Sequence, residues 1–285
     1  MKSARKSANV DDATVASFGA EWDAFDQSCI SPEDYERYFD SYFAIFPFNE
    51  LPKNSEGFDL GCGSGRWALG VAPCVGLLHC IDPAVQALDV ARRRLAGHSN
   101  VAFHRAAADS IPLPDDSQDF GYALGVLHHV PDTQAALVDC VRKLKPGAPF
   151  LLYLYYAFDN RPGWFEALWK LSDWVRRGIS RLPFPARRAV ADAIALAVYW
   201  PMARAARLAE RLSVDVRHFP LSFYRHSSLY TMRTDSLDRF GTRLEHRFSR
   251  AQIEQMMRSA GLADIVFNAS EPYWTACGRR AARGR

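Results

Sequence analysis

The sequence predicts a doubly wound α/β fold built on a mostly parallel sheet of seven strands. Between residues 56 and 156, short apolar runs alternate with amphipathic segments. Strands that are apolar throughout and are separated by helices are typical of a parallel sheet covered on both faces. A glycine-rich turn at 61–65 follows the first run and opens the first expected helix. The core of the protein is therefore expected in this region.

The elements of this core follow from the apolar runs and the breaks between them. The expected strands are 57–60, 77–82, 101–105, 120–125 and 150–156, and the expected helices are 66–71, 85–96 and 133–144. A later helix at 249–259, stopped at Gly261, and two strands near 263–268 and 273–278 complete the sheet.

Helical segments flank this core in the sequence. Residues 1–13 are polar and are expected to fray, whereas 14–48 are rich in aromatic residues, with a helix start at Ser31 and Pro32. After residue 157, one helix covers 164–175 and a second covers 186–212, with a kink expected at Pro201. A third section, 220–244, holds several tyrosine, arginine and aspartate residues.

Composition and charge exclude several classes of protein. The 285 residues suffice for a large core, and 48% hydrophobic and 24% charged residues are ordinary for a globular protein. The 35 basic and 32 acidic residues nearly cancel, so we expect no nucleic-acid partner. The six cysteines form no CxxC pair, which favours neither a disulfide framework nor a metal site. No metal is expected.

The N-terminus has basic residues but no apolar stretch behind them, so it does not resemble a signal peptide. The longest uncharged apolar run in the second half is 193–203, whereas a membrane span needs about 20 residues. We therefore expect a cytoplasmic protein with reduced thiols.

The glycine turn carries the clearest chemical signal. Gly61, Gly63 and Gly65 alternate with other residues, and without side chains there the backbone can approach a ligand closely. The GxGxG spacing continues with Arg66 and so departs from the dinucleotide-binding pattern. Asp59, just before the turn, would repel a phosphate and suits a ligand that bears a cation.

Two further acids end the next strands. Asp82 ends the second strand, where a carboxylate can accept hydrogen bonds from both hydroxyls of a ribose. Asp109 follows the third strand and is placed to accept a hydrogen bond from the exocyclic amine of a purine. A cation-tolerant turn, a ribose acceptor and an adenine acceptor together describe S-adenosylmethionine (SAM) better than a dinucleotide.

Five segments in order resemble the class I SAM-dependent methyltransferases, which have a Rossmann-like fold. They are DLGCGSG at 59–65, HCIDP at 79–83, ADSIPLPDDSQDF at 108–120, ALGVLHHVPD at 123–132 and LKPGAPFLLYLY at 144–155, and the segment 247–262 resembles the family's last core helix. The resemblance implies a SAM-binding core at 51–157, completed by 247–285 with its basic tail. It also implies a methyl transfer to a small organic acceptor.

The resemblance assigns expected roles residue by residue. Those around the methionine part of SAM are Asp59, Gly61, Cys62, Gly63 and Gly65; those at the ribose are Asp82 and Pro83; those at the adenine are Ala108 and Asp109; and Gly125 lies beside the sulfonium. His128 and His129 follow the fourth strand, where the family's site opens toward the acceptor. Either is a candidate general base, and the alternative is that the pair only packs locally.

The acceptor side of the site is less defined by the sequence. Residues 1–50 are expected to form a helical lid, in which Phe18 and Trp22 resemble a cofactor-covering element; the alternative is a helix docked on the sheet edge. The insert 158–246 is expected to cap an apolar pocket. A dimer surface and a membrane-surface contact are its alternatives. The remaining candidate acceptor contacts are Tyr224, Tyr230, Arg233 and Asp235.

The sequence leaves the acceptor and the assembly open. A hydrophobic small molecule is expected, with attack by oxygen, nitrogen or carbon, and the chain is expected to be a monomer or a homodimer. Two alternatives remain: a protein of the same fold that uses SAM for a reaction other than methylation, or a non-catalytic binding partner.

Overall fold

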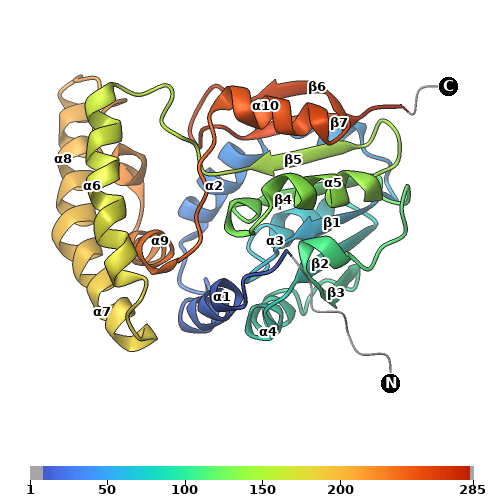
Figure 1. The fold of residues 1–285 in the computed structure, drawn as a ribbon, viewed down its shortest axis with the longest axis horizontal. Coiled ribbons are helices and arrows are strands. Elements are labelled where there is room, and N and C mark those ends of the chain that lie inside the picture. Colours follow the sequence, from blue (N-terminus) through green and yellow to red (C-terminus); the bar gives the residue numbers. More distant parts are fainter. Residues whose placement is uncertain (1–8, 283–285) are drawn as a thin grey trace. The chain divides into compact units, whose positions relative to one another are not determined.

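The computed structural model describes residues 9–282 and contains the expected sheet (Figure 1). Seven strands lie in the order β3-β2-β1-β4-β5-β7-β6, all parallel except β7, which pairs antiparallel with β5 and β6. The strands are β1 (Glu56–Leu60), β2 (Leu77–Asp82), β3 (Val101–Arg105), β4 (Phe120–Leu124), β5 (Pro149–Tyr153), β6 (Leu262–Phe267) and β7 (Ala276–Arg280). The predicted doubly wound fold is confirmed.

The helices outside residues 158–246 agree with the sequence pattern in type and approximate position. They are α1 (Asp12–Ala24), α2 (Pro32–Phe43), α3 (Ala68–Val71), α4 (Val85–Arg94), α5 (Thr133–Lys143) and α10 (Arg250–Ser259). Ser249 caps α10, and its hydroxyl accepts a hydrogen bond from the backbone N–H of Gln252. The expected polar start at 1–8 and the last three residues of the basic tail lie outside the described residues.

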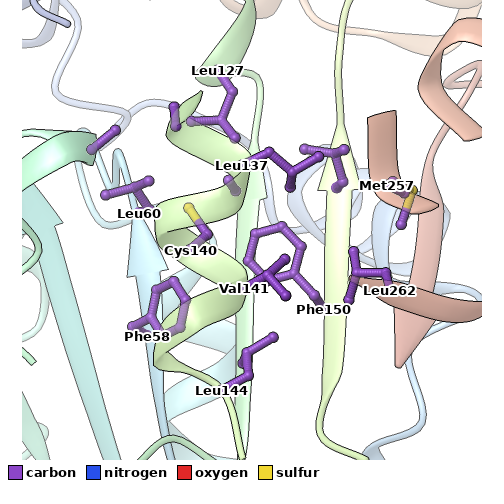
Figure 2. Packing of buried hydrophobic residues seen from close by; sticks show 14 of the residues in the cluster. Phe58, Leu60, Leu127, Leu137, Cys140, Val141, Leu144, Phe150, Met257 and Leu262 are labelled. Atoms are coloured by element: carbon purple, nitrogen blue, oxygen red, sulfur yellow. The ribbon is translucent and has the colours of Figure 1, made fainter. Parts of the chain in front are cut away.

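Helices α5 and α10 cover one face of the sheet with the main hydrophobic core (Figure 2). Phe58 and Leu60 of β1 meet Leu137 and Cys140 of α5 in this cluster, and all four are at most 2% exposed. Met257 extends the same cluster onto α10. Because this layer fixes β1 and β4 firmly, the loops at their carboxyl ends have a rigid support.

Aromatic residues cover the opposite face of β4. Phe43, at the end of α2, packs edge-on against Tyr122 with a centroid distance of 5.4 Å, and Phe46 packs on Phe120 at 6.1 Å. Residues on a strand alternate between the two faces, which explains why Phe120 and Tyr122 share this side. Part of the aromatic residues in the first fifty therefore packs on the sheet, whereas Phe25 and Tyr38 pack on Tyr230 and Phe223, in the segment 158–243.

The chain divides into two compact units. One contains the sheet and consists of 1–23, 39–157 and 244–285, and the other, here called the helical unit, consists of 24–38 and 158–243. The helices of the second are α6 (Gly163–Ile179), α7 (Phe184–Ile194), α8 (Trp200–Arg211) and α9 (Leu229–Gly241), with the first part of α2.

The helical unit has its own core. Ile179 of α6, Ala203 of α8 and Met232 of α9 are buried in one cluster. Arg176, 5% exposed, donates to the carboxylate of Asp173 at 2.7 Å and to the carbonyl of Thr242 at 2.6 Å. A buried arginine with both an ionic and a carbonyl partner stabilises the helix arrangement rather than a ligand site.

Two expectations for the flanking segments need correction. The start of the chain does not fray up to residue 13, because Asn9 is buried and α1 begins at Asp12. The irregularity expected at Pro201 is a π-helical turn, Ala195–Tyr199, directly before α8. A proline removes one backbone donor and clashes with the preceding turn, and a widened turn accommodates both effects.

Candidate active site

The glycine turn between β1 and α3 has the backbone conformation that only glycine adopts without strain. The φ angles of Gly61, Gly63 and Gly65 are +70°, +52° and +73°. A Cβ on Gly61 would lie 2.4 Å from the methyl groups of Val126, in the loop after β4. The turn is further held by the N–H groups of residues 61 and 62, which both donate to the carbonyl of Ile81. The loops after β1, β2 and β4 therefore meet at one point of the sheet edge.

Asp59 is a buried acid with an unused acceptor. It is 1% exposed, and its Oδ2 has no hydrogen-bond partner among residues 9–282. Burial raises the pKa of Asp59 to about 8, the nearby Tyr122 hydroxyl opposes the rise, and the Asp82 carboxylate adds to it. A buried carboxyl of this kind gains most from a cationic partner.

Asp82 at the end of β2 joins two backbone segments. Its Oδ2 accepts from the N–H of Gly63 at 3.0 Å, and its Oδ1 accepts from the N–H of Ala84 at 2.8 Å. Burial raises the pKa of Asp82 to about 6, although both backbone hydrogen bonds oppose the rise. A carboxylate has about four acceptor positions, so these two bonds leave capacity for ligand hydroxyls. The predicted ribose contact Pro83 follows directly and is half-buried.

Asp109 and Ala108 lie in a short 3-10 turn after β3, Ala108–Ser110. The Oδ2 of Asp109 accepts from the backbone N–H of Asn9 at 3.1 Å. The Asn9 side chain in turn donates to the carbonyl of Asp132 and accepts from its N–H, at 2.8 and 2.7 Å. The predicted adenine acceptor thus contacts a backbone group of the chain itself. Asn9 ties the loops after β3 and β4 together.

Gly125 directly follows β4 and lies beside open space. Its φ angle is +80°, and a Cβ there would meet no described atom within 4 Å. The following 3-10 turn, Leu127–His129, carries the two histidines. Residues 59–65, 82 and 125 therefore lie at the carboxyl ends of β1, β2 and β4, which is where ligands bind in open α/β sheets.

The two histidines are in different hydrogen-bonding states. The Nδ1 atom of His128 accepts from the backbone N–H of Tyr155 at 3.3 Å, so the neutral ring carries its proton on Nε2. His128 is fully buried and stacks on the ring of Tyr155 at 3.8 Å, and burial lowers its pKa well below the usual value. His128 is therefore neutral and presents a donor at Nε2.

His129 has the opposite tautomer. Its Nδ1 lies 2.7 Å from the carbonyl oxygen of Leu244. A carbonyl only accepts, so Nδ1 carries the proton and Nε2 carries the lone pair. Of the two histidines, His129 is the one arranged to accept a proton in its neutral form.

Helix α1 lies across the same edge of the sheet. A Cβ on Gly63 would lie 3.0 Å from the indole of Trp22. The ring of Phe18 lies 5.0 Å from that of His129. Gly19 lies close to the side chain of Gln86 in α4, since a Cβ on Gly19 would be 2.8 Å from the Oε1 of Gln86. One helix thus touches the glycine turn, the start of α4 and the histidine turn.

The other predicted acceptor contacts lie in the helical unit. Arg233 donates twice to Asp192, at 2.8 and 2.7 Å, and the Tyr230 hydroxyl accepts from the backbone N–H of Gln27. Tyr224 packs on Tyr199 with a centroid distance of 5.3 Å, and Asp235 interacts electrostatically with Tyr38. The structure gives these residues packing and pairing roles within that unit, and an acceptor contact stays a prediction.

Sequence reasoning missed several groups of this site. Asn9 gives no signal, because one polar residue in a polar segment has no pattern. The Leu244 carbonyl, which sets the tautomer of His129, is a backbone atom that no residue type encodes. Tyr155 was visible only as part of an apolar strand, although its position after β5 places it on His128.

Residues 58–152 match a family model described as a methyltransferase domain. This range contains the glycine turn, all three strand-end acids and both histidines. The chain carries a class I methyltransferase domain. Domains of this family use SAM, and this methyltransferase domain has the residues to hold it. The fit depends on the unpartnered oxygen of Asp59 and the open space at Gly125.

Curated methyltransferases are similar in sequence to part of this chain. An uncharacterized methyltransferase, YcgJ, from Bacillus subtilis (strain 168) is 35% identical over 104 residues, which cover 36% of this chain and 41% of the relative. A demethylmenaquinone methyltransferase from Bacillus licheniformis is 26% identical over 123 residues, covering 42% of this chain and 52% of the relative. The chain spans about half the length of the curated relatives it matches.

A solved structure is similar over nearly the whole chain. It is a chain in the complex between the Haloferax volcanii Trm112 methyltransferase activator and the putative methyltransferase. The TM-score is 0.51 at 16% identity, over 92% of this chain and 98% of that chain. At this identity the similarity concerns the fold, including the sheet of the methyltransferase domain.

Proposed function

We propose that this chain transfers the methyl group of SAM to a small apolar organic acceptor. The observation that carries the proposal is the convergence of the glycine turn, Asp59, Asp82 and the open space at Gly125 on one edge of the sheet. The relatives named demethylmenaquinone methyltransferase support an apolar, quinone-like acceptor. When bound, SAM supplies an electrophilic methyl group on a sulfonium sulfur.

The chain's residues then have mainly a positioning role. Asp59, as a carboxylate, would pair with the ammonium group of the methionine part, and Asp82 would accept hydrogen bonds from the ribose hydroxyls. Helix α1 excludes water from the glycine turn through Trp22. The Nε2 of His129 would accept the proton that the acceptor loses when its nucleophilic atom bonds to the methyl carbon and the bond from that carbon to the sulfonium sulfur breaks.

The proposal is tested with the purified chain, SAM and a panel of acceptors that includes reduced demethylmenaquinone and simple phenols. We expect S-adenosylhomocysteine to form with at least one apolar acceptor, and we expect SAM but not NAD to bind in a calorimetric titration. SAM binding without product across the panel would favour the non-catalytic alternative, and failure to bind SAM would overturn the cofactor assignment.

Replacing His129 by glutamine should lower turnover by about 100-fold or more while SAM affinity stays unchanged, because a positioned base contributes about 10²–10⁴-fold. His128→Gln is the matched control. It removes a buried ring that stacks on Tyr155, so we expect lower stability but nearly normal turnover of the folded protein. The His129→Gln deficit should shrink for acceptors that ionise at lower pH. Equal turnover of both variants and the parent would contradict a proton-accepting role.

Trp22→Ala should weaken SAM binding by about tenfold, or ~1.4 kcal/mol, if α1 covers the cofactor. The indole is the side chain of α1 that approaches Gly63 most closely. The adjacent exposed Asp23→Ala variant serves as the control in the same helix. Titration calorimetry of both gives the answer, and equal affinities would show that α1 is a docked helix with no covering role.

A further inference from the structure

The helical unit exposes apolar side chains that its own core does not use. On α6, Trp164, Leu168, Leu171 and Val175 recur at spacings of four, three and four residues, which places them on one stripe of the helix. They are 52%, 45%, 63% and 40% exposed, and Trp174 beside them is 75% exposed. The apolar residues that were expected to cap an acceptor pocket therefore face outward within their unit.

Helix α8 repeats this feature. Trp200, Leu208 and Leu212 are 46%, 59% and 69% exposed, while Ala203 and Ala206 on the other side are fully buried. In the view of Figure 1, the axes of α6 and α8 are nearly parallel, and the chain runs along them in opposite directions. Exposed apolar residues in such number on two helices of one unit indicate an interaction surface.

The exposed apolar residues are accompanied by positive charge. The segment 161–217 has eleven basic and five acidic side chains, a net charge of +6, in a chain whose total is +3. Arg181, at the end of α6, and Arg207 and Arg211, on α8, form no ion pair within the described part of the chain. Their charge is available to a partner.

The positive charge and the exposed apolar side chains together indicate which kind of partner this surface binds. A second copy of this chain would bring another basic segment, with its unpaired arginines, against the first, and like charges repel. A nucleic acid would neutralise the arginines but would leave the tryptophan and leucine stripes in water. An anionic lipid surface can bind both the apolar residues and the arginines. Tryptophan and leucine side chains enter the membrane interface, and the arginines pair with the lipid headgroups.

We propose that α6 and α8 dock the chain on an anionic lipid surface. Contact occurs from one side only, since within residues 9–282 no helix has the length and apolarity needed to cross a bilayer. This surface belongs to the helical unit, whereas the proposed methyl-transfer site belongs to the sheet unit. On the function proposed above, docking gives an enzyme that acts on apolar acceptors access to the phase in which they dissolve.

The test is cosedimentation of the full chain with vesicles of phosphatidylglycerol and of phosphatidylcholine. We expect binding to the anionic vesicles that is lost in about 1 M salt, where the screening length falls to about 3 Å. Arg207→Gln/Arg211→Gln should weaken binding by about 25-fold, since each arginine near an anionic surface contributes about fivefold. Trp164→Gln/Trp174→Gln should weaken it by about tenfold or more through lost apolar contact.

Matched controls lie on the sheet unit. Lys53→Gln/Arg93→Gln removes the same charge from exposed positions that, like the two arginines replaced on α8, form no ion pair within the described residues, and Val266→Gln removes an apolar side chain that is 56% exposed. Both should bind vesicles like the parent. Equal binding by all variants, or no binding of the parent to anionic vesicles, would overturn the proposal. It would also be overturned if light scattering showed a dimer that Trp164→Gln/Trp174→Gln converts to a monomer without any effect of lipid.

Discussion

Asp59→Asn should weaken SAM binding by about 100-fold, or ~3 kcal/mol, and should abolish the proton that binding releases near neutral pH. In the free protein, burial raises the pKa of Asp59 to about 8, so the carboxyl is protonated at pH 7. An ammonium group beside it favours the carboxylate and lowers this pKa on binding. The proton must then leave.

The direction of the pH effect follows from this release. From about pH 6.5 to about pH 7.5, SAM affinity should rise by up to tenfold per pH unit, because the protein gives up one proton for each molecule bound. The lower limit keeps clear of Asp82, whose pKa is about 6. Calorimetry in two buffers with different ionisation enthalpies measures the proton count directly.

The same substitution should stabilise the free protein. Since the pKa of Asp59 is higher in the folded chain than in the unfolded one, the folded state binds more protons between about pH 4 and about pH 8, and its stability falls as pH rises through that range. Asparagine removes this dependence. At pH 8 we therefore expect a higher urea midpoint for Asp59→Asn together with weaker SAM binding.

Two controls separate this role from a general effect of burial. 5′-Methylthioadenosine lacks the ammonium group, so its binding should release no proton and should respond little to Asp59→Asn. Asp89→Asn, an exposed acid on α4, should leave both ligands unaffected. Unaltered SAM affinity and proton count in the Asp59 variant would show that the carboxyl does not meet the cofactor.

The strands could be predicted because residues that disfavour a strand stand before and after them in the sequence. The expected bounds of β2 and β3 agree with the structure to the residue, since Gly76 and Pro83 delimit the first and Asn100 precedes the second. Helix α9 was not expected as a helix. Its buried side includes Thr231, Thr234 and Ser236, and these polar residues interrupt the apolar periodicity that predicts a helix.

Those buried hydroxyls are satisfied by partners far away in the sequence. Ser236 donates to the carbonyl of Ala191 at 2.9 Å, and Thr231 donates to Asp34 at 3.2 Å. A polar residue is buried at little cost when such a partner exists, but the partner is known only from the fold. For the same reason, the roles of Asn9 and of the Leu244 carbonyl could not be predicted from the sequence. The glycine turn could be predicted, because its positive φ angles restrict these positions to glycine.

Gly61→Ala should destabilise the protein by about 3 kcal/mol and remove measurable SAM binding. A left-handed conformation costs alanine about 1–2 kcal/mol, and overlap with a packed neighbour costs about 1–3 kcal/mol more. The new Cβ would lie 2.4 Å from both methyl groups of Val126. Val126 is branched and directly precedes the histidine turn, so any shift that relieves the overlap also displaces His128 and His129.

Alanine variants of two other glycines distinguish the effect of backbone strain from the effects of steric overlap and of lost cofactor binding. Gly147 has a φ of +82° and Gly125 one of +80°, and a Cβ on either would meet no described atom within 4 Å. Both alanine variants should therefore lose only about 1–2 kcal/mol in urea unfolding. Gly147→Ala should bind SAM normally, because it lies at the opposite end of β5, before its first residue. Gly125→Ala should weaken SAM binding despite equal stability, since its methyl group occupies the space assigned to the sulfonium end. If Gly125→Ala and Gly147→Ala bind SAM equally well, the cofactor lies elsewhere on the sheet edge, and the assignment of Gly125 is wrong.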